Sequence, residues 1–199
     1  MRAHPPRVAA LALAVVAACA SCSDTTEGTP VAAPPGPPPP PVPVAYGAPP
    51  VTSPLNASAY LTQPCSILTG EQLTSLGFPP QGKPDTHSGP ADIAGPACTW
   101  QNEQRTTQAA FITANKNGLS DIYRGHQQGD FQFWQPTTIA GYPAVFNDPT
   151  DLRSVGACGL NVGISDTLTI LVAVEGSDTD PCAPARQAAA MVIDTLKAG

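Results

Sequence analysis

The sequence predicts an α+β fold in which an antiparallel sheet is backed by helices, held by two disulfides and preceded by a disordered, proline-rich linker. Three observations lead to this prediction: paired stretches of alternating apolar residues, an apolar helical stripe near the C-terminus, and four cysteines after residue 60. The stretch 61–199 that carries them has the length of one globular domain with a single core.

The clearest periodicity lies in two consecutive stretches, 158–164 and 168–174, separated by Ser165 and Asp166. Apolar residues occupy every second position in both stretches, and the positions between them are mostly small or polar. Because side chains alternate between the two faces of a strand, this pattern predicts a β-hairpin with one buried face.

The segment after the hairpin begins with a helix signal, in which Asp180 caps the first turn and Pro181 takes the first helical position. The apolar residues of the helix recur on one face, at Cys182, Ala185, Ala189, Val192 and Leu196. Packing this face against a sheet produces the two layers of an α+β domain.

A capping-box pattern marks the start of an earlier helix. Thr69 and Gln72 are spaced so that each side chain can satisfy a free backbone N–H of the first turn. We therefore expect a short helix over 70–76, ended by Gly77. The stretch 78–97 that follows is rich in proline, glycine and aspartate and is predicted to be an irregular surface loop.

The middle of the domain is expected to supply the remaining strands and one more short helix. Alternating or aromatic-rich stretches predict strands beginning at Cys98 and covering 107–115, 131–138 and 143–147. The spacing of Leu119, Ile122 and Tyr123 predicts a helix over 118–126.

The N-terminus has the features of a secretory signal. Arg2 and Arg7 precede a short apolar run that ends in small residues before Cys19. Crossing a bilayer takes about 20 apolar residues, so this run is too short for a membrane span. We expect residues 1–18 to be a lipoprotein signal peptide and the rest of the chain to be exported.

The cysteine at the end of this run indicates lipidation. Cys19 follows two alanines, with the branched Val16 three positions upstream, which resembles the bacterial lipobox. In such signals the cysteine receives fatty acids such as palmitate and becomes the new N-terminus. Cys19 is the expected lipidation site, Cys22 is the alternative, and a plain signal without lipid is the remaining interpretation. The lipid would anchor the protein in the bilayer, on the extracytoplasmic face of the cell membrane.

Residues 19–60 are expected to form the lipidated cysteine and a disordered linker. Twelve of the 25 prolines fall in 30–54, where there is almost no charge and no apolar period. Such a segment cannot bury enough surface to offset its ordering entropy, so it is expected to be an extended, polyproline-like spacer. The globular α+β domain then covers 61–199.

The charge of the mature chain argues against some partners. The chain carries a formal net charge of −6; nine basic residues less Arg2 and Arg7, against fifteen acidic ones, leave −8 after cleavage. An acidic domain without a basic cluster does not suit nucleic acid, and we expect none as a partner.

Four cysteines lie in the domain, at Cys65, Cys98, Cys158 and Cys182. An even number in an exported domain predicts two disulfides, and three connectivities are open. We favour Cys65 with Cys98 and Cys158 with Cys182, because each pair flanks one local unit. A zinc site is the weaker interpretation, since no two of these cysteines have the close spacing of a metal knuckle. No metal or cofactor is predicted.

Several short motifs together resemble one family. They are the segment 64–69 (PCSILT), Cys98-Thr99-Trp100, Cys158-Gly159-Leu160 and Asp180-Pro181-Cys182. In order and spacing, they look like an actinobacterial lipoprotein family known only as a domain of unknown function, which includes mycobacterial Lpr-type lipoproteins. The resemblance implies a two-disulfide cell-envelope lipoprotein with no established activity, and it transfers no catalytic residue.

The sequence contains no recognisable catalytic motif. No Gly-x-Ser-x-Gly elbow and no Gly-rich phosphate loop is present, so no catalytic residue is predicted. We expect a non-catalytic module that binds a cell-wall, small-molecule or protein ligand through Trp100, Trp134 and Tyr142. For each of these aromatic residues, ordinary core packing is the alternative. The alternative function is an envelope hydrolase that uses dispersed acidic residues.

Overall fold

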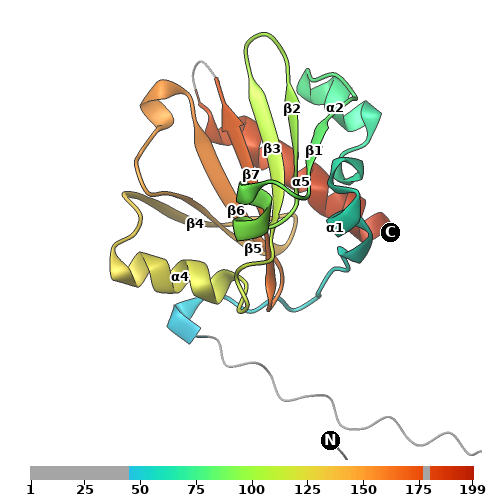
Figure 1. Cartoon of the computed structure of the whole chain (residues 1–199). Helices are drawn as coiled ribbons and strands as arrows, with labels where there is room; N and C mark the ends of the chain where they lie inside the picture. Colours follow the sequence, from blue (N-terminus) through green and yellow to red (C-terminus); the bar gives the residue numbers. More distant parts are fainter. Residues whose placement is uncertain (1–44, 177–179) are drawn as a thin grey trace, which may run out of the picture. The chain divides into compact units, whose positions relative to one another are not determined.

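The structure, a computed structural model, describes residues 45–176 and 180–199 (Figure 1). The predicted signal peptide over 1–18, both candidate lipidation sites, Cys19 and Cys22, and the linker up to residue 44 lie outside the described residues. Within the described part, no helix combines the length and the apolar composition needed to cross a bilayer.

A seven-stranded sheet forms the centre of the domain, and every neighbouring pair of strands is antiparallel. The strands lie in the order β1-β2-β3-β7-β6-β5-β4 (Figure 1). In chain order they are β1 (Lys83–Asp85), β2 (Ala97–Gln101), β3 (Thr106–Ile112), β4 (Phe133–Ile139), β5 (Tyr142–Asp148), β6 (Cys158–Ser165) and β7 (Leu168–Glu175). The predicted antiparallel sheet is confirmed.

Helices lie on both faces of this sheet. They are η1 (Ala45–Gly47), α1 (Ser58–Thr62), η2 (Pro64–Ile67), α2 (Gly70–Leu76), α3 (Gly89–Ala94), α4 (Leu119–Gln128), η3 (Arg153–Val155) and α5 (Cys182–Ala198). The predicted closing helix is α5, which begins at Cys182 and so places Pro181 just before the first helical residue instead of in it. The Asp180 carboxylate accepts a hydrogen bond from the Cys182 N–H at 3.0 Å. The α+β fold class is therefore confirmed.

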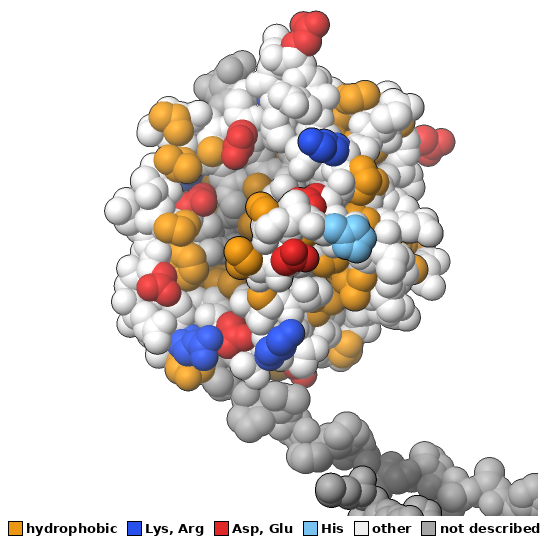
Figure 2. Space-filling model, in the orientation of Figure 1, with side chains coloured by type: hydrophobic (Ala, Val, Ile, Leu, Met, Phe, Trp, Pro, Cys, Tyr) orange, Lys and Arg blue, Asp and Glu red, His pale blue; other side chains and the backbone are white. Residues whose placement is uncertain are grey.

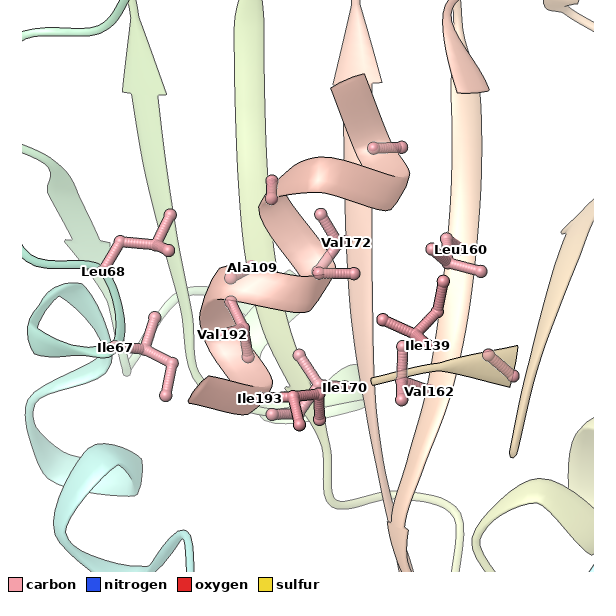
Figure 3. Packing of buried hydrophobic residues seen from close by; sticks show 14 of the residues in the cluster. Ile67, Leu68, Ala109, Ile139, Leu160, Val162, Ile170, Val172, Val192 and Ile193 are labelled. Atoms are coloured by element: carbon pink, nitrogen blue, oxygen red, sulfur yellow. The ribbon is translucent and has the colours of Figure 1, made fainter. Parts of the chain in front are cut away.

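The main core lies between α5 and one face of the sheet. Alternate residues of the predicted hairpin, such as Leu160 and Val172, point to this side and are at most 1% exposed. Val192 and Ile193 of α5 pack in the same cluster (Figure 3). Burying a side chain of this size stabilises the fold by about 1.5–3 kcal/mol, so this layer supplies most of the apolar stabilisation.

The opposite face of the sheet has a smaller cluster. Leu119 of α4, Val145 of β5 and Ala48 are buried together, with Tyr123 and Trp134 packed against them. Because α4 packs on the part of the sheet that contains β5, it leaves other strands of this face without that cover.

Both disulfides join a helical segment to a strand. Cys65 of η2 is bonded to Cys98 of β2, with 4.9 Å between the Cα atoms. Cys158 of β6 is bonded to Cys182 of α5, with 5.2 Å between the Cα atoms. The favoured connectivity is confirmed, and the second bond fixes the start of α5 to the central sheet.

The stretch 78–97 is more regular than predicted. It contains the edge strand β1 and the helix α3, whose first turn is capped by Ser88: the hydroxyl accepts from the Ala91 N–H at 3.4 Å. The loop prediction was wrong here because three- and six-residue elements are too short to show a period. β1 is ordered by its pairing with β2, and α3 is ordered by its contacts with β3.

Packed structure also begins before Leu61, the expected start of the domain. Ala48, Val51 and Ala57 are buried, at 2%, 7% and 4% exposure. The Leu55 N–H donates to the Ile164 carbonyl oxygen at 2.8 Å, which attaches this segment to the end of β6. A few apolar residues and one long-range hydrogen bond are enough to order it, although its composition is that of a linker.

The capping box of α2 is present as predicted, and its loss is the first testable change. The Thr69 hydroxyl accepts from the Gln72 N–H at 3.2 Å, and the Gln72 side chain accepts from the Thr69 N–H at 2.8 Å. We expect Thr69→Ala to lower the free energy of unfolding by about 1 kcal/mol, measured by urea denaturation. Thr69→Ser keeps the oxygen and is the control; equal losses in both variants would contradict a capping role.

The two outer strands each contain a proline. Pro84 lies in the middle of β1, and Pro136 lies within β4. Proline has no backbone N–H, and in sheets it is largely confined to edge strands and strand ends, where both residues are found here.

Candidate functional site

The candidate site is a row of side chains on the sheet face opposite α5. Residues paired across neighbouring strands share a face, and the pairing brings Trp134 to Asn147 and brings Gly159, Ala173, Gln108 and Thr99 into one line. Gly159 joins the two parts, because a Cβ on it would lie 3.2 Å from the Asn147 carbonyl oxygen. We call these six residues the open row.

The open row runs over most of the sheet and is only partly covered. Thr99, Gln108 and Ala173 are half-buried, although they lie in the middle strands. Figure 2 views the molecule from the side opposite α5 and shows this face hollowed to the left of the centre, with hydrophobic and acidic side chains around the hollow. Thr99, Gln108 and Ala173 therefore form the accessible part of the row, whereas Asn147 and Gly159 are buried.

Two asparagines next to each other form the most unusual feature of this face of the sheet. Asn147 of the open row and Asn161 of β6 are 7% and 5% exposed, and the Asn161 Nδ2 donates to the Asn147 Oδ1 at 2.9 Å. This bond uses one group of each amide. One N–H₂ and one carbonyl oxygen remain without a side-chain hydrogen bond, whichever way the two amides are turned.

The unused groups of this pair are not fully enclosed. Among the described residues, only the Trp100 Nε1 and the Thr169 Oγ1 are fully enclosed and unpaired, so the spare asparagine groups keep some accessible surface. A buried polar group without a partner costs about 1–3 kcal/mol. The pair is therefore typical of a position where water or a ligand completes the hydrogen bonds.

Aromatic rings form the wall at one end of the row. The Trp134 ring lies parallel to the His126 ring, with 4.0 Å between centroids and 2° between planes, and it meets Tyr123 edge-on at 4.9 Å. Tyr123 and His126 are one turn apart on α4, which places both against the same side chain. Burial raises the pKa of Tyr123. The Trp134 ring is thus held in place by its neighbours.

Asp148 follows the row at the end of β5 and has a perturbed acidity. Partial burial raises the pKa of its carboxyl group, and the nearby Asp151 carboxylate raises it further, although the N–H of Gly159 donates to it at 3.2 Å and acts in the opposite direction. Asp151 differs because a side-chain hydrogen bond from Arg153 lowers its pKa to about 2.

These opposite shifts predict opposite effects of pH. Because the folded pKa of Asp148 lies above its unfolded value, its favourable contribution exists at low pH and is lost as the pH rises through the folded pKa. We expect Asp148→Asn to be more stable than the natural protein at pH 7 and equal to it near pH 3, measured by thermal denaturation. Asp151→Asn is the control of opposite sign, since a lowered pKa stabilises above the unfolded value; a shift of both variants in one direction would refute the assignment.

The three predicted binding residues do not lie together. Trp100 is 1% exposed in the main core, on the face of the sheet that α5 covers. Tyr142 is 6% exposed, donates its hydroxyl to the Ser53 carbonyl oxygen at 2.9 Å, and borders a cavity of about 280 Å³ with Lys197. Of the three, Trp134 alone belongs to the open row.

The asparagines and Gln108 were not identified from the sequence. The signal that could have found them is in the hairpin, where the positions facing away from α5 are Gly159, Asn161 and Gly163. A polar residue between two glycines on the second face of a central strand indicates a face that is neither packed core nor ordinary surface.

The described residues contain no group of three metal-binding side chains. The chemistry available at the row is hydrogen bonding by uncharged amides and a hydroxyl, bounded by an aromatic wall and one carboxylate.

One protein-family model matches a range of residues that includes both the open row and the disulfides. The model of a family described as a protein of unknown function (DUF3558) matches residues 14–195. The chain belongs to the DUF3558 family. No curated protein and no solved structure matches the chain. Membership in DUF3558 thus assigns a family and no activity, and the function has to be argued from the site.

Proposed function

We propose that this DUF3558 protein is a lipid-anchored protein of the cell envelope, of the actinobacterial Lpr type, that binds a ligand on the open row without catalysing a reaction. The N-terminal signal and Cys19 support the anchor. The two disulfides support an oxidising location, because thiols stay reduced in the cytosol of most organisms.

The binding part of this proposal is based on one observation. The Asn147–Asn161 pair is nearly buried and has hydrogen-bonding groups that no side chain uses. A natural sequence that needed only stability would gain by filling these two positions with apolar residues of similar volume. Their presence on the sheet face that α4 covers only in part is explained by a ligand that completes the pair.

The hydrolase alternative requires two carboxylates that face one site. The pKa values of Asp148 and Asp151 are shifted in opposite directions, which is the pattern of an acid and its partner. However, both oxygens of Asp151 are bound by Arg153, at 2.8 Å from Nε and 2.7 Å from Nη2. A carboxylate held in this way is a poor nucleophile, so binding is favoured over hydrolysis.

The anchor is tested by metabolic labelling of the full precursor with palmitate in a bacterial host that processes lipoproteins. We expect label in the natural protein and in Cys22→Ser, and no label in Cys19→Ser. Accumulation of unprocessed precursor in the presence of globomycin is expected in parallel. Absence of label from the natural protein would overturn the lipid anchor.

The binding part is tested by hydrogen exchange of the detergent-solubilised mature protein, with and without a total envelope extract. We expect slower exchange in β5, β6 and β7 and no change in α5, because only the first group borders the open row. Asn161→Leu, which removes the donor of the pair at similar volume, is expected to abolish the slowing. Equal exchange with and without extract would refute a ligand site on this face.

A further inference from the structure

We infer that the ligand of the open row is a neutral oligosaccharide that lies across the strands. This inference rests on the proposed function, since it names the class of ligand for the same site. Four properties of the row lead to it. Its six residues offer uncharged polar groups, none of them is a cation, small residues separate the polar ones, and the row extends across several strands.

The polar groups of the row are amides and a hydroxyl. Gln108 donates its Nε2 to the Thr99 Oγ1 at 3.2 Å, which leaves the second Gln108 N–H and its carbonyl oxygen for a ligand. Together with Asn147 and Asn161, these side chains offer both donors and acceptors. Sugar hydroxyls are donors and acceptors at once, so they can satisfy such a mixed set.

The electrostatics disfavour an anionic ligand. None of the six residues of the open row is ionisable, but the Asp148 carboxylate lies at Gly159, 3.5 Å from the position that a Cβ there would take. The cation in register with the row, Lys83, is exposed at the outer strand beyond Thr99. Binding of phosphate or carboxylate groups generally uses arginine or lysine at the contact. An acidic chain whose row has a carboxylate beside it and no cation among its six residues therefore fits a neutral ligand better than an anion.

Small residues separate the polar positions. Gly159 and Ala173 lie between Asn147 and Gln108 in the row. The Asp148 and Leu171 side chains cover Gly159, so the place where a ligand can approach the backbone closely is the half-buried Ala173 of β7. Trp134 closes one end with a rigid aromatic surface. This alternation of polar and apolar surface suits a sugar chain, whose rings have C–H faces as well as hydroxyls.

The length of the row indicates several sugar units. Asn147 in β5 and Gln108 in β3 are separated by three strand spacings, which is about 14 Å. One sugar ring is too short to contact both residues. A chain of several rings reaches both and gains from each contact.

The test uses the mature protein in detergent and an array of neutral glucan, galactan, mannan and arabinan hexasaccharides, with uronic-acid and phosphorylated hexasaccharides beside them. We expect binding to at least one neutral hexasaccharide and at least tenfold weaker binding to its monosaccharide. Gln108→Ala and Thr99→Ala are expected to weaken this binding about three- to tenfold, the value of one hydrogen bond. Both positions are half-buried, and thermal denaturation verifies that the variants fold.

The matched control is Gln135→Ala. Gln135 is an exposed amide on β4 that points to the opposite face from Trp134, so its loss is expected to leave binding unchanged. Binding of acidic hexasaccharides only, or equal binding by Gln108→Ala, would overturn the inference. If no array member binds while envelope extract still slows exchange in β5 to β7, the ligand class is wrong and the proposed site stands. If neither effect occurs, both proposals fail.

Discussion

Replacing Cys158 and Cys182 together by alanine is expected to lower the free energy of unfolding by about 3–4 kcal/mol. The bond closes a loop of 24 residues, and removing it restores the conformational freedom of that loop in the unfolded chain. The loss is large because Cys158 is 2% exposed in the main core, so the variant also loses packing there. Guanidinium denaturation followed by circular dichroism measures the change.

Reduction of the remaining disulfide in the double variant is the control for this result. In the double variant, dithiothreitol is expected to cause a second, separate loss of about 3–4 kcal/mol through the remaining Cys65–Cys98 bond, whose loop spans 33 residues. An unfolding midpoint of the double variant equal to that of the natural protein would show that the second bond does not stabilise the fold.

Gly95→Ala is expected to cost about 3–5 kcal/mol, the sum of backbone strain and overpacking. Gly95 has φ +131°, a conformation that residues with a side chain rarely adopt. A Cβ there would overlap the Phe111 carbonyl oxygen and lie 2.9 Å from the Thr113 nitrogen, and both are backbone atoms that cannot rotate away. The measurement is again the free energy of unfolding.

Gly89→Ala is the matched control for this substitution. Gly95 directly follows the helix α3, and Gly89 is the first residue of that helix. A Cβ on Gly89 would have no atom within 4 Å. We expect a change within about 0.5 kcal/mol. A similar loss in both variants would mean that α3 is sensitive to any added methyl group, and the argument from the Phe111 contact would be wrong.

Features with a strong local cause could be predicted from the sequence. The helix α2 begins at Gly70 and ends at Leu76 as expected, because Thr69, Gln72 and Gly77 determine both ends through bonds within a few residues. The hairpin of β6 and β7 follows from strict alternation over two stretches. The disulfide pairing follows from the same local units, since each bond closes a short loop.

Features that depend on distant contacts could not be predicted. The edge strand β1 is ordered by its pairing with β2, and the segment before Leu61 is ordered by the Leu55 bond to Ile164. The candidate site has the same origin. Trp134, Asn147 and Gln108 lie in three strands, and only the strand order shows that they share a face.

The tryptophans illustrate the same limit. Trp100 and Trp134 are each followed by a glutamine within a predicted strand. One lies in the core and the other borders the open row, because the pleat of β2 turns Trp100 toward α5 while β4 turns Trp134 toward α4. Composition alone gives no information about which way a pleat faces.

The prolines of the two outer strands affect whether neighbouring molecules associate through their sheet edges. A sheet with bare edges can grow by adding strands from a second molecule, and the growth depends on a regular series of backbone donors. Pro84 and Pro136 each remove one donor from an outer edge. Many copies held close together would therefore tend to stay separate molecules instead of joining edge to edge into fibres.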